Sequence, residues 1–384
     1  MTGKAVEVRR HASLAELPRE AWNALAGESP FMRHEFLHAL EASGCVGPDT
    51  GWEPCHLSLW QGGELVAAAP LYRKFHSRGE YVFDWAWADA LEQAGGRYYP
   101  KLLCAVPFAA VSGPRLLSES AVFGGQLLHA MLQTVQEAAL SSFHCLFPRT
   151  EDLALLGPQL LVRRGYQYHW RNEGYRDFAE FLGRLSHDKR KKIRQERRRV
   201  FDAGCRFVHK TGRDITESDW LFFHDCYART YRQHRSTPYL NLDFFLRLGA
   251  EMPDNLLLIV AERDGRPVAC ALDLFDRTSL YGRYWGALEY LPGLHFETSY
   301  YQGMEFCLQR GLAVFEGGAQ GEHKLARGFL PVVTHSAHWL AHGGLAHAVE
   351  EFVRREGHAI EHYLDELDGP YRREDASHAD RPAE

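Results

Sequence analysis

Hydrophobic and polar positions along the chain predict the same succession of elements twice: a strand, two helices, a hairpin, a strand, a helix and a strand. In the first half, these elements are expected at residues 5–10, 17–25, 34–42, 56–74, 101–106, 122–140 and 142–147. In the second half, they are expected at residues 206–209, 217–233, 242–250, 256–275, 280–286, 299–310 and 312–315. Such a repeat predicts two domains of similar fold.

The two hairpins give the clearest sign of this repetition. The sequence GGELVAA at Gly62–Ala68 matches DGRPVAC at Asp264–Cys270. A hairpin followed by a strand–helix–strand unit predicts an α/β fold, in which helices pack on a mixed sheet. We therefore expect one domain at residues 6–172 and a second at 173–366. The charged residues 367–384 are expected to form a disordered tail.

Three further segments connect these elements. Residues 77–99 are rich in aromatic side chains and predict irregular structure. Residues 151–163 predict a short helix that leads into a strand, RGYQYHW. Residues 178–201 predict one helix, which opens the second half of the chain.

The composition is that of a globular protein in a reducing compartment. Of the 384 residues, 45% are hydrophobic, which is enough for a substantial core. The eight cysteines form no C-x-x-C pair, so the spacing indicates buried thiols. The N-terminal sequence has no apolar signal-peptide region, and the longest apolar run, Leu256–Ala261, is too short to cross a bilayer. We expect a cytoplasmic protein without a transmembrane segment.

Positive charge is concentrated in the predicted basic helix, although the net charge of the chain is −6. Nine basic residues lie between Arg184 and Arg199, opposed by Asp188 and Glu196 alone. This surface suits the phosphates of tRNA, of a UDP-linked or lipid-linked precursor, or of an anionic membrane. A solvated helix is the alternative interpretation. The expected phosphate-binding residues are Lys189, Arg190, Lys191, Lys192 and Arg194.

Residues 294–339 contain the densest group of side chains able to do chemistry. A helix there ends at Gly311, and a short apolar strand follows it. The glycines of the next segment allow backbone groups to approach a ligand closely. Glu322, His323 and Lys324 come next, at the end of the strand, where open α/β sheets bind their ligands.

Several long motifs make the chain resemble one bacterial family, described as GNAT-like proteins of peptidoglycan biosynthesis or recognition. The motifs are YYPKL at Tyr98–Leu102, VSGPRLL at Val111–Leu117, LSHDKRKKIRQERRRV at Leu185–Val200, LHFETSYYQG at Leu294–Gly303 and GAQGEHKLARGF at Gly318–Phe329. The resemblance extends over residues 6–366 and implies two tandem GNAT-like domains of the acyl-CoA N-acyltransferase superfamily. It also relates the chain to the Fem-type peptidoglycan aminoacyltransferases.

This resemblance implies an N-acyltransferase or aminoacyltransferase that acts on an amine, with a peptidoglycan precursor as the expected substrate. Enzymes of the superfamily that use acetyl-CoA usually carry a Q/R-x-x-G-x-G/A loop, which neither half of this chain contains. Fem-type enzymes lack that loop too and take the aminoacyl group from tRNA. Acetyl-CoA, another acyl-CoA and aminoacyl-tRNA therefore all remain candidate donors.

Acyl transfer to an amine requires a base, hydrogen-bond donors for the carbonyl oxygen and groups that hold both substrates. The expected catalytic residues are His323, Glu322, His295 and Glu297. The expected substrate-binding residues are Lys324, Arg327, Gln320, Tyr301 and Gln302.

Two other functions are consistent with the same residues. A metal hydrolase would use His295, Glu322, His323, His335 and His338, but their spacing matches neither H-E-x-x-H nor H-x-x-E-H, so no metal is expected. A non-catalytic protein that binds cell-wall precursors would keep the fold without the chemistry. Turnover assays distinguish the enzyme from the binding protein.

Overall fold

The computed structural model describes residues 5–157, 159–318, 321–367 and 371 of the chain. The chain forms two compact units. Unit 1 contains residues 1–165 and 333–363, and unit 2 contains residues 166–332 and 364–384. The predicted domains, 6–172 and 173–366, differ from these units chiefly at residues 333–363, and they stay a prediction.

Unit 1 contains a small antiparallel sheet, in the order β1-β3-β4-β7, and part of a second sheet, in the order β15-β8-β6-β5-β2. Its strands are β1 Val6–His11, β2 Trp52–Pro54, β3 His56–Gln61, β4 Glu64–Ala69, β5 Leu71–Lys74, β6 Lys101–Cys104, β7 Leu117–Ser118 and β8 Ser142–Leu146. Its helices are α1 Arg19–Ala26, α2 His34–Ala42, α3 Trp85–Gln93, α4 Ala121–Glu137, α5 Leu153–Leu156 and most of α12 Gly343–Glu366, with short 3-10 turns at Leu14–Glu16, Pro30–Met32, Pro48–Thr50 and Thr150–Asp152.

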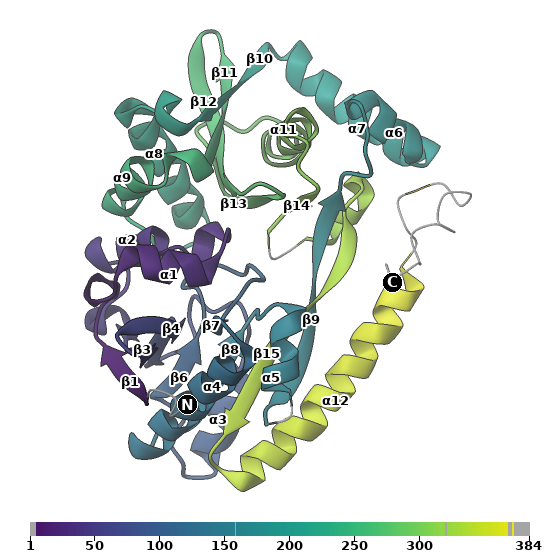
Figure 1. Cartoon of the computed structure of the whole chain (residues 1–384). Coiled ribbons are helices and arrows are strands. Elements are labelled where there is room, and N and C mark those ends of the chain that lie inside the picture. Colours follow the sequence, from purple (N-terminus) through teal and green to yellow (C-terminus); the bar gives the residue numbers. More distant parts are fainter. Residues whose placement is uncertain (1–4, 158, 319–320, 368–370, 372–384) are drawn as a thin grey trace. The chain divides into compact units, whose positions relative to one another are not determined.

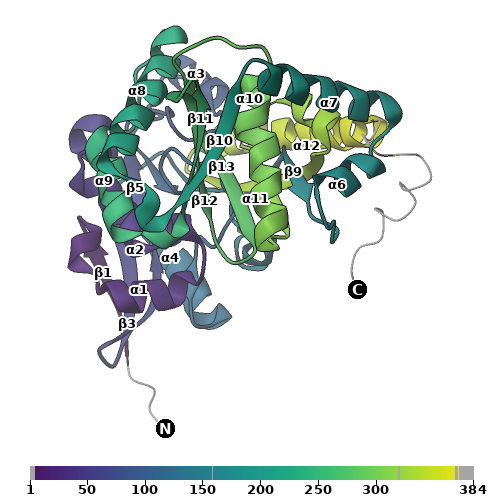
Figure 2. The same ribbon diagram turned by 90° about the horizontal axis from the view of Figure 1, so that it is seen from above.

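Unit 2 is built on strands in the order β10-β11-β12-β13-β14-β9. Helices α8 and α9 lie on one side of these strands, and α11 lies on the other (Figure 1, Figure 2). The strands are β10 Cys205–Thr211, β11 Leu256–Arg263, β12 Arg266–Phe275, β13 Ser279–Ala287 and β14 Val314–Glu316. The helices are α6 Phe178–Arg184, α7 His187–Asp202, α8 Glu217–Gln233, α9 Leu242–Glu251, α10 Leu294–Phe296, the π-helix η7 Glu297–Tyr301, α11 Gln302–Arg310 and the 3-10 turns Gly212–Asp214, Pro253–Asn255 and η8 Glu322–Arg327.

Two long strands pass from one unit to the other. Strand β9, Leu161–Arg171, begins in unit 1 and ends in unit 2, where Trp170 is opposite Phe315 of β14. Strand β15, Leu330–Leu340, begins in unit 2 and ends in unit 1, where Ala337 is opposite Cys145 of β8. The strand that follows each predicted repeat therefore crosses between the units, so that β9 pairs with β14 and β15 pairs with β8.

Both predicted hairpins are confirmed. Strands β3 and β4 turn at Gly62 and Gly63, and strands β11 and β12 turn at Asp264 and Gly265. All four turn residues have positive φ, as the favoured two-residue hairpin loop requires. Each hairpin also has a register shift at an equivalent position, between Leu59 and Trp60 in the first and between Ala261 and Glu262 in the second.

Four local predictions are wrong. Residues 77–99 contain helix α3, in which Trp87 and Leu91 are one turn apart and pack into the core. Residues 151–163 form only a short helix, because β9 already begins at Leu161. The predicted basic helix is two helices, α6 and α7, separated where the buried Leu185 takes an extended conformation. Residues Glu322–Arg327 form a 3-10 turn instead of the end of a strand.

Candidate active site

Strands β13 and β14 form a parallel pair that separates at its carboxyl end. The ladder joins Ser279–Tyr281 to Val314–Glu316, whereas β13 continues to Ala287. The ladder between β13 and β14 therefore ends at Tyr281 and Glu316. The opposite edge of β13 has a register shift against β12 next to Gly282. Irregular strand ends of this kind are common next to binding and active sites.

Lys324 extends its side chain toward this strand end. It is 2% exposed, and its Nζ donates to the Gly318 carbonyl at 2.8 Å. A side chain at Gly317 would meet Lys324, because a Cβ there would lie 3.2 Å from the lysine Cε. Burial, and then the nearby Arg283 guanidinium, lower the pKa of Lys324 to about 7. This lysine therefore exchanges a proton near neutral pH.

His323, Tyr300 and His295 form an aromatic group beside Lys324. The Tyr300 Oη lies 3.1 Å from Nε2 of the exposed His323. The His295 ring centroid is 5.4 Å from that of Tyr300 and 5.1 Å from that of Trp285. Burial, followed by the positive charge of Arg327 and Lys324, lowers the pKa of His323. His323 is thus neutral at pH 7 and has a ring nitrogen able to accept a proton.

The pKa of His295 is lowered further than that of His323. Burial, and then the neighbouring His323, Arg327 and Lys324, lower it to about 4. His295 therefore stays uncharged across the physiological range. Glu322, which precedes His323 in the 3-10 turn, is exposed.

Glu297 interacts with different partners from those of His323. Its carboxylate is 0% exposed and accepts hydrogen bonds from Arg197 at 2.9–3.2 Å. The Gln302 amide donates to the same carboxylate at 2.8 Å, and His209 donates to the Gln302 carbonyl. Burial outweighs the attraction of Arg197 and raises the pKa of Glu297. The structure thus brings His295 and His323 together, and it places Glu297 in an ion pair with α7.

Arg327 and Tyr301 share Glu196 as their partner. The Arg327 guanidinium is 2.7 Å from one Glu196 oxygen, and the Tyr301 hydroxyl donates to the other at 2.5 Å. Arg327 also lies over the Phe296 ring and donates to the His323 carbonyl at 2.7 Å. These contacts fix the 3-10 turn that carries His323. Gln320 falls outside the described residues.

Asp273 is an acidic residue at this site that the sequence analysis missed. It lies on β12 opposite Gly282, is 1% exposed, and its Oδ2 has no hydrogen-bond partner in the structure. Burial raises the pKa of Asp273 well above its usual range, which favours the protonated carboxyl. The sequence did contain a signal for Asp273, because this residue interrupts the apolar run ACALDLF. A charged side chain in such a run is costly to bury unless it is paired or has a functional role.

The five predicted phosphate-binding residues all lie on α7. Lys191, Lys192 and Arg194 are exposed, and Lys189 and Arg190 are half-buried. Ile193 and Val200 of the same helix are buried. None of the helices in the described part of the chain combines the length and the hydropathy needed to span a bilayer.

The histidines considered for a metal belong to different units. His335 and His338 lie on the part of β15 in unit 1, whereas His295, Glu322 and His323 belong to unit 2. Nδ1 of the buried His338 is 2.6 Å from Nδ1 of His144. Within residues 5–157, 159–318, 321–367 and 371, no three His, Cys, Asp or Glu side chains are placed to hold a metal ion.

The same region of unit 1 contains a buried charge network. The Lys101 ammonium, which is fully buried, lies 2.8 Å from Glu80 and 2.5 Å from Asp84. Asp84 also accepts a hydrogen bond from Tyr98, whose hydroxyl lies 3.2 Å from His144. This network is enclosed by α3 and α12, so it holds the sheet and helices of unit 1 together.

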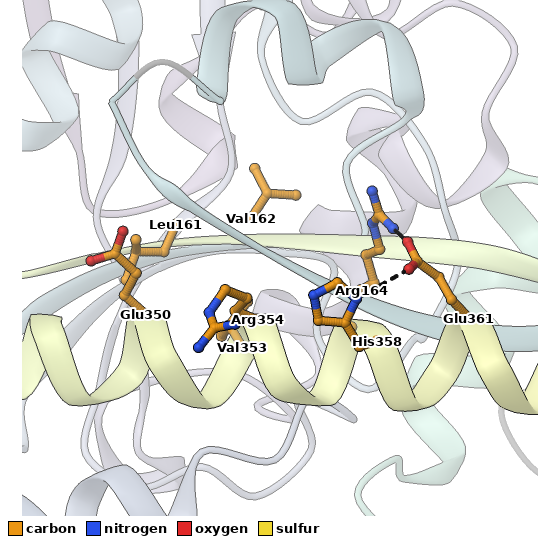
Figure 3. Close-up of a pocket in the computed structure, with 9 residues that line it drawn as sticks. Leu161, Val162, Arg164, Glu350, Val353, Arg354, His358 and Glu361 are labelled. Carbon is orange, nitrogen blue, oxygen red and sulfur yellow. Dashed lines mark hydrogen bonds and ion pairs between the residues drawn. The ribbon is translucent and has the colours of Figure 1, made fainter.

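Unit 1 also has a shallow pocket between the start of β9 and α12, with a volume of about 350 Å³ (Figure 3). Arg164 pairs there with Glu361, which also lies 3.5 Å from His358 (Figure 3). Leu161, Val162 and Val353 supply its apolar wall. The pocket lacks the converging reactive groups found at the end of β13 and β14.

Comparison with known proteins assigns the sequence to a family. The sequence matches the FemAB-like family, described as peptidoglycan biosynthesis/recognition, over residues 13–373. The chain belongs to the FemAB-like family. A search of curated proteins gives no match.

Solved structures show that this FemAB-like protein shares its fold with FemX and with two proteins described as lysylphosphatidylglycerol synthetases. The C-terminal domain of a putative lysylphosphatidylglycerol synthetase from Agrobacterium fabrum matches with a TM-score of 0.55 at 10% identity, over 88% of this chain and 96% of that one. FemX matches with a TM-score of 0.51 at 12% identity, over 90% and 100%. The L-PGS structure from Bacillus licheniformis matches with a TM-score of 0.50 at 11% identity, over 83% and 89%. The predicted α/β fold with GNAT-like domains is confirmed.

Proposed function

We propose that this FemAB-like protein transfers an aminoacyl or acyl group to an amine in peptidoglycan precursor metabolism. The main support is the strand end of unit 2, where a histidine able to accept a proton and a lysine with a pKa of about 7 lie near the point at which the β13–β14 ladder ends. Membership of the family supports the cell-wall context. FemX and the two lysylphosphatidylglycerol synthetase structures support the type of reaction through their shared fold.

In the proposed reaction, His323 acts as the general base. Its neutral ring takes a proton from the acceptor ammonium, and the free amine attacks the donor carbonyl. Backbone N–H groups at the edge of β13 stabilise the oxygen as it gains charge. The new amide forms as the bond to the leaving group breaks. The leaving group takes up the second proton, which the attacking nitrogen loses, and His323 releases the first proton to solvent. Lys324 holds a carboxylate or phosphate of a substrate, and Tyr300 orients His323.

The donor is either acyl-CoA or aminoacyl-tRNA. Lys189, Arg190, Lys191, Lys192 and Arg194 support a donor or surface rich in phosphates, such as tRNA or an anionic membrane. Such contacts weaken as salt rises, because exposed charges are screened. We propose that the protein works in the cytoplasm, where both donors are present.

His323→Ala tests the catalytic role. Product formation should be assayed with a peptidoglycan precursor as acceptor and with each donor in turn. The variant should lower kcat by about two to four powers of ten and leave the fold intact, because the side chain is exposed. His347→Gln, an exposed histidine on α12, is the matched control and should keep full activity. Full turnover in His323→Ala would refute the role of His323. Precursor binding without turnover in the wild type would instead favour a binding protein.

A further inference from the structure

Unit 2 also contains a pocket, which lies between α6, α7 and α11. Its volume is about 670 Å³, within the range of small-molecule sites. It is lined by residues of the three helices and by the two residues before α6, which together are Arg176, Asp177, Phe178, Ala179, Leu182, Arg194, Arg197, Arg198, Glu305, Leu308 and Gln309. His323 and Lys324 are not among its lining residues.

Two arginines of this pocket are free to bind an anion. Arg194 and Arg198 are exposed and lie one helical turn apart on α7, so their side chains project from the same face. Neither guanidinium has a hydrogen-bond or ion-pair partner among the residues that the structure describes. Two guanidinium groups at this spacing can each donate two hydrogen bonds to one phosphate.

The acidic groups of the pocket are already engaged. Asp177 caps α6 by accepting from the Glu180 amide at 2.8 Å. Glu305 lies 2.7 Å from Arg197, which also holds the buried Glu297. The lining contains four arginines and two carboxylates, so the pocket keeps a net positive charge.

The floor of the pocket is apolar. Phe178, Ala179 and Leu182 come from α6, and Leu308 comes from α11. The Arg197 guanidinium lies 4.5 Å from the centre of the Phe178 ring, so its charge covers part of this floor. An apolar group lying on the floor would have its attached anion beside Arg194 and Arg198.

We propose that this pocket binds a phosphate carried on an apolar stem. The arginines bind the phosphate, and the stem packs on Phe178, Leu182 and Leu308. The ligand is either a membrane lipid phosphate or a soluble alkyl phosphate, because both have this chemistry. The proposal does not depend on acyl transfer at His323 and Lys324, and the pocket shares only Arg194 with the phosphate-binding residues of α7 proposed above.

Calorimetric titration of the full chain with hexyl phosphate tests the pocket. The wild type should bind hexyl phosphate at least about tenfold more tightly than inorganic phosphate, because the stem buries apolar surface. Arg194→Gln with Arg198→Gln should lower the affinity by about tenfold or more, the loss expected for charge-assisted hydrogen bonds. Leu308→Gln should reduce the preference for hexyl phosphate over inorganic phosphate.

The matched control is Arg199→Gln with Arg206→Gln, which removes equal charge from exposed positions of α7 and β10 outside the pocket. This control should keep wild-type affinity. Cosedimentation with phosphatidylcholine vesicles that contain phosphatidic acid then identifies the source of the phosphate. If the protein binds these vesicles and only the pocket variant loses that binding, the ligand is a membrane lipid. If the protein binds hexyl phosphate but not the vesicles, the ligand is a soluble compound. Equal losses in both double variants, equal affinity for hexyl and inorganic phosphate, or no binding of either probe would overturn the proposal.

Discussion

Lys324 shows how a single buried residue links stability to pH. Its pKa is about 7 in the folded protein, whereas an exposed lysine in the unfolded chain has its ordinary value near 10.4. Between these two pH values the unfolded chain binds more protons than the folded protein. The unfavourable contribution of Lys324 to the free energy of unfolding is therefore largest below pH 7 and decreases as the pH rises. A methionine has a similar length and no charge.

Lys324→Met should therefore stabilise the protein more at pH 6 than at pH 10. The free energy of unfolding of the wild type should rise relative to that of the variant by up to about 1.4 kcal/mol per pH unit above pH 7. Urea unfolding at several pH values measures this difference. A difference that does not change with pH would mean that Lys324 keeps an ordinary pKa. The variant should also lose acyl transfer, because the proposed substrate contact is gone.

Arg197 supports a second prediction at the residue scale. Its guanidinium is the charged partner of the fully buried Glu297. Arg197→Ala should lower the free energy of unfolding by about 3–5 kcal/mol, because it leaves a buried carboxylate without its counter-ion. Adding Glu297→Gln should recover part of this loss. Arg199→Ala, on the exposed face of the same helix, should change the free energy by less than about 0.5 kcal/mol.

The candidate site could be predicted only in part from the sequence. The sequence indicates that His295, His323 and Lys324 belong to a chemically dense stretch. It cannot indicate that Glu297 turns toward α7, because its partner Arg197 is distant in the chain. The lowered pKa of Lys324 depends likewise on burial and on Arg283 of another strand.

Among the elements, the hairpins were predicted best because their signal is local. Positive φ is needed at Gly63 and Gly265, and the two-residue loop fixes the register of the strands on either side. Helix α3 and the separation of α6 from α7 were missed because tertiary packing decides them. Trp87 joins a core with residues of α12, and Leu185 is drawn into the core of unit 2.

The equivalence of the two hairpins predicts equivalent effects of substitution. Gly63→Ala and Gly265→Ala should each lower the free energy of unfolding by about 1–2 kcal/mol, because a Cβ is strained at positive φ. No atom lies within 4 Å of either new Cβ, so backbone strain is the whole cost. Gly125→Ala, inside α4, should instead stabilise by about 0.5–1 kcal/mol. Urea unfolding followed by circular dichroism measures all three; unequal hairpin effects would argue against equivalence.

At the scale of the whole molecule, unit 1 depends on the C-terminal part of the chain. Strand β15 pairs with β8, and Leu345, Val349 and Val353 of α12 complete a core cluster with α3. A chain that ends at residue 332 should therefore lose hydrogen-exchange protection in β8 and α3, although those elements lie far from the cut in sequence. A chain that ends at residue 367 is the control and should keep that protection. Full protection of β8 in the shorter chain would contradict the dependence.

The exchange of β9 and β15 has a consequence for a protein made of a single repeat. With this connectivity, one repeat sends the strand that follows it away from its own sheet and leaves a strand edge open. Two separate copies would close each other's sheets, as partners do in a domain-swapped dimer. Fusion into one polypeptide makes that pairing intramolecular, so the dilution that dissociates a dimer cannot separate the two halves. The two halves are then free to diverge in sequence.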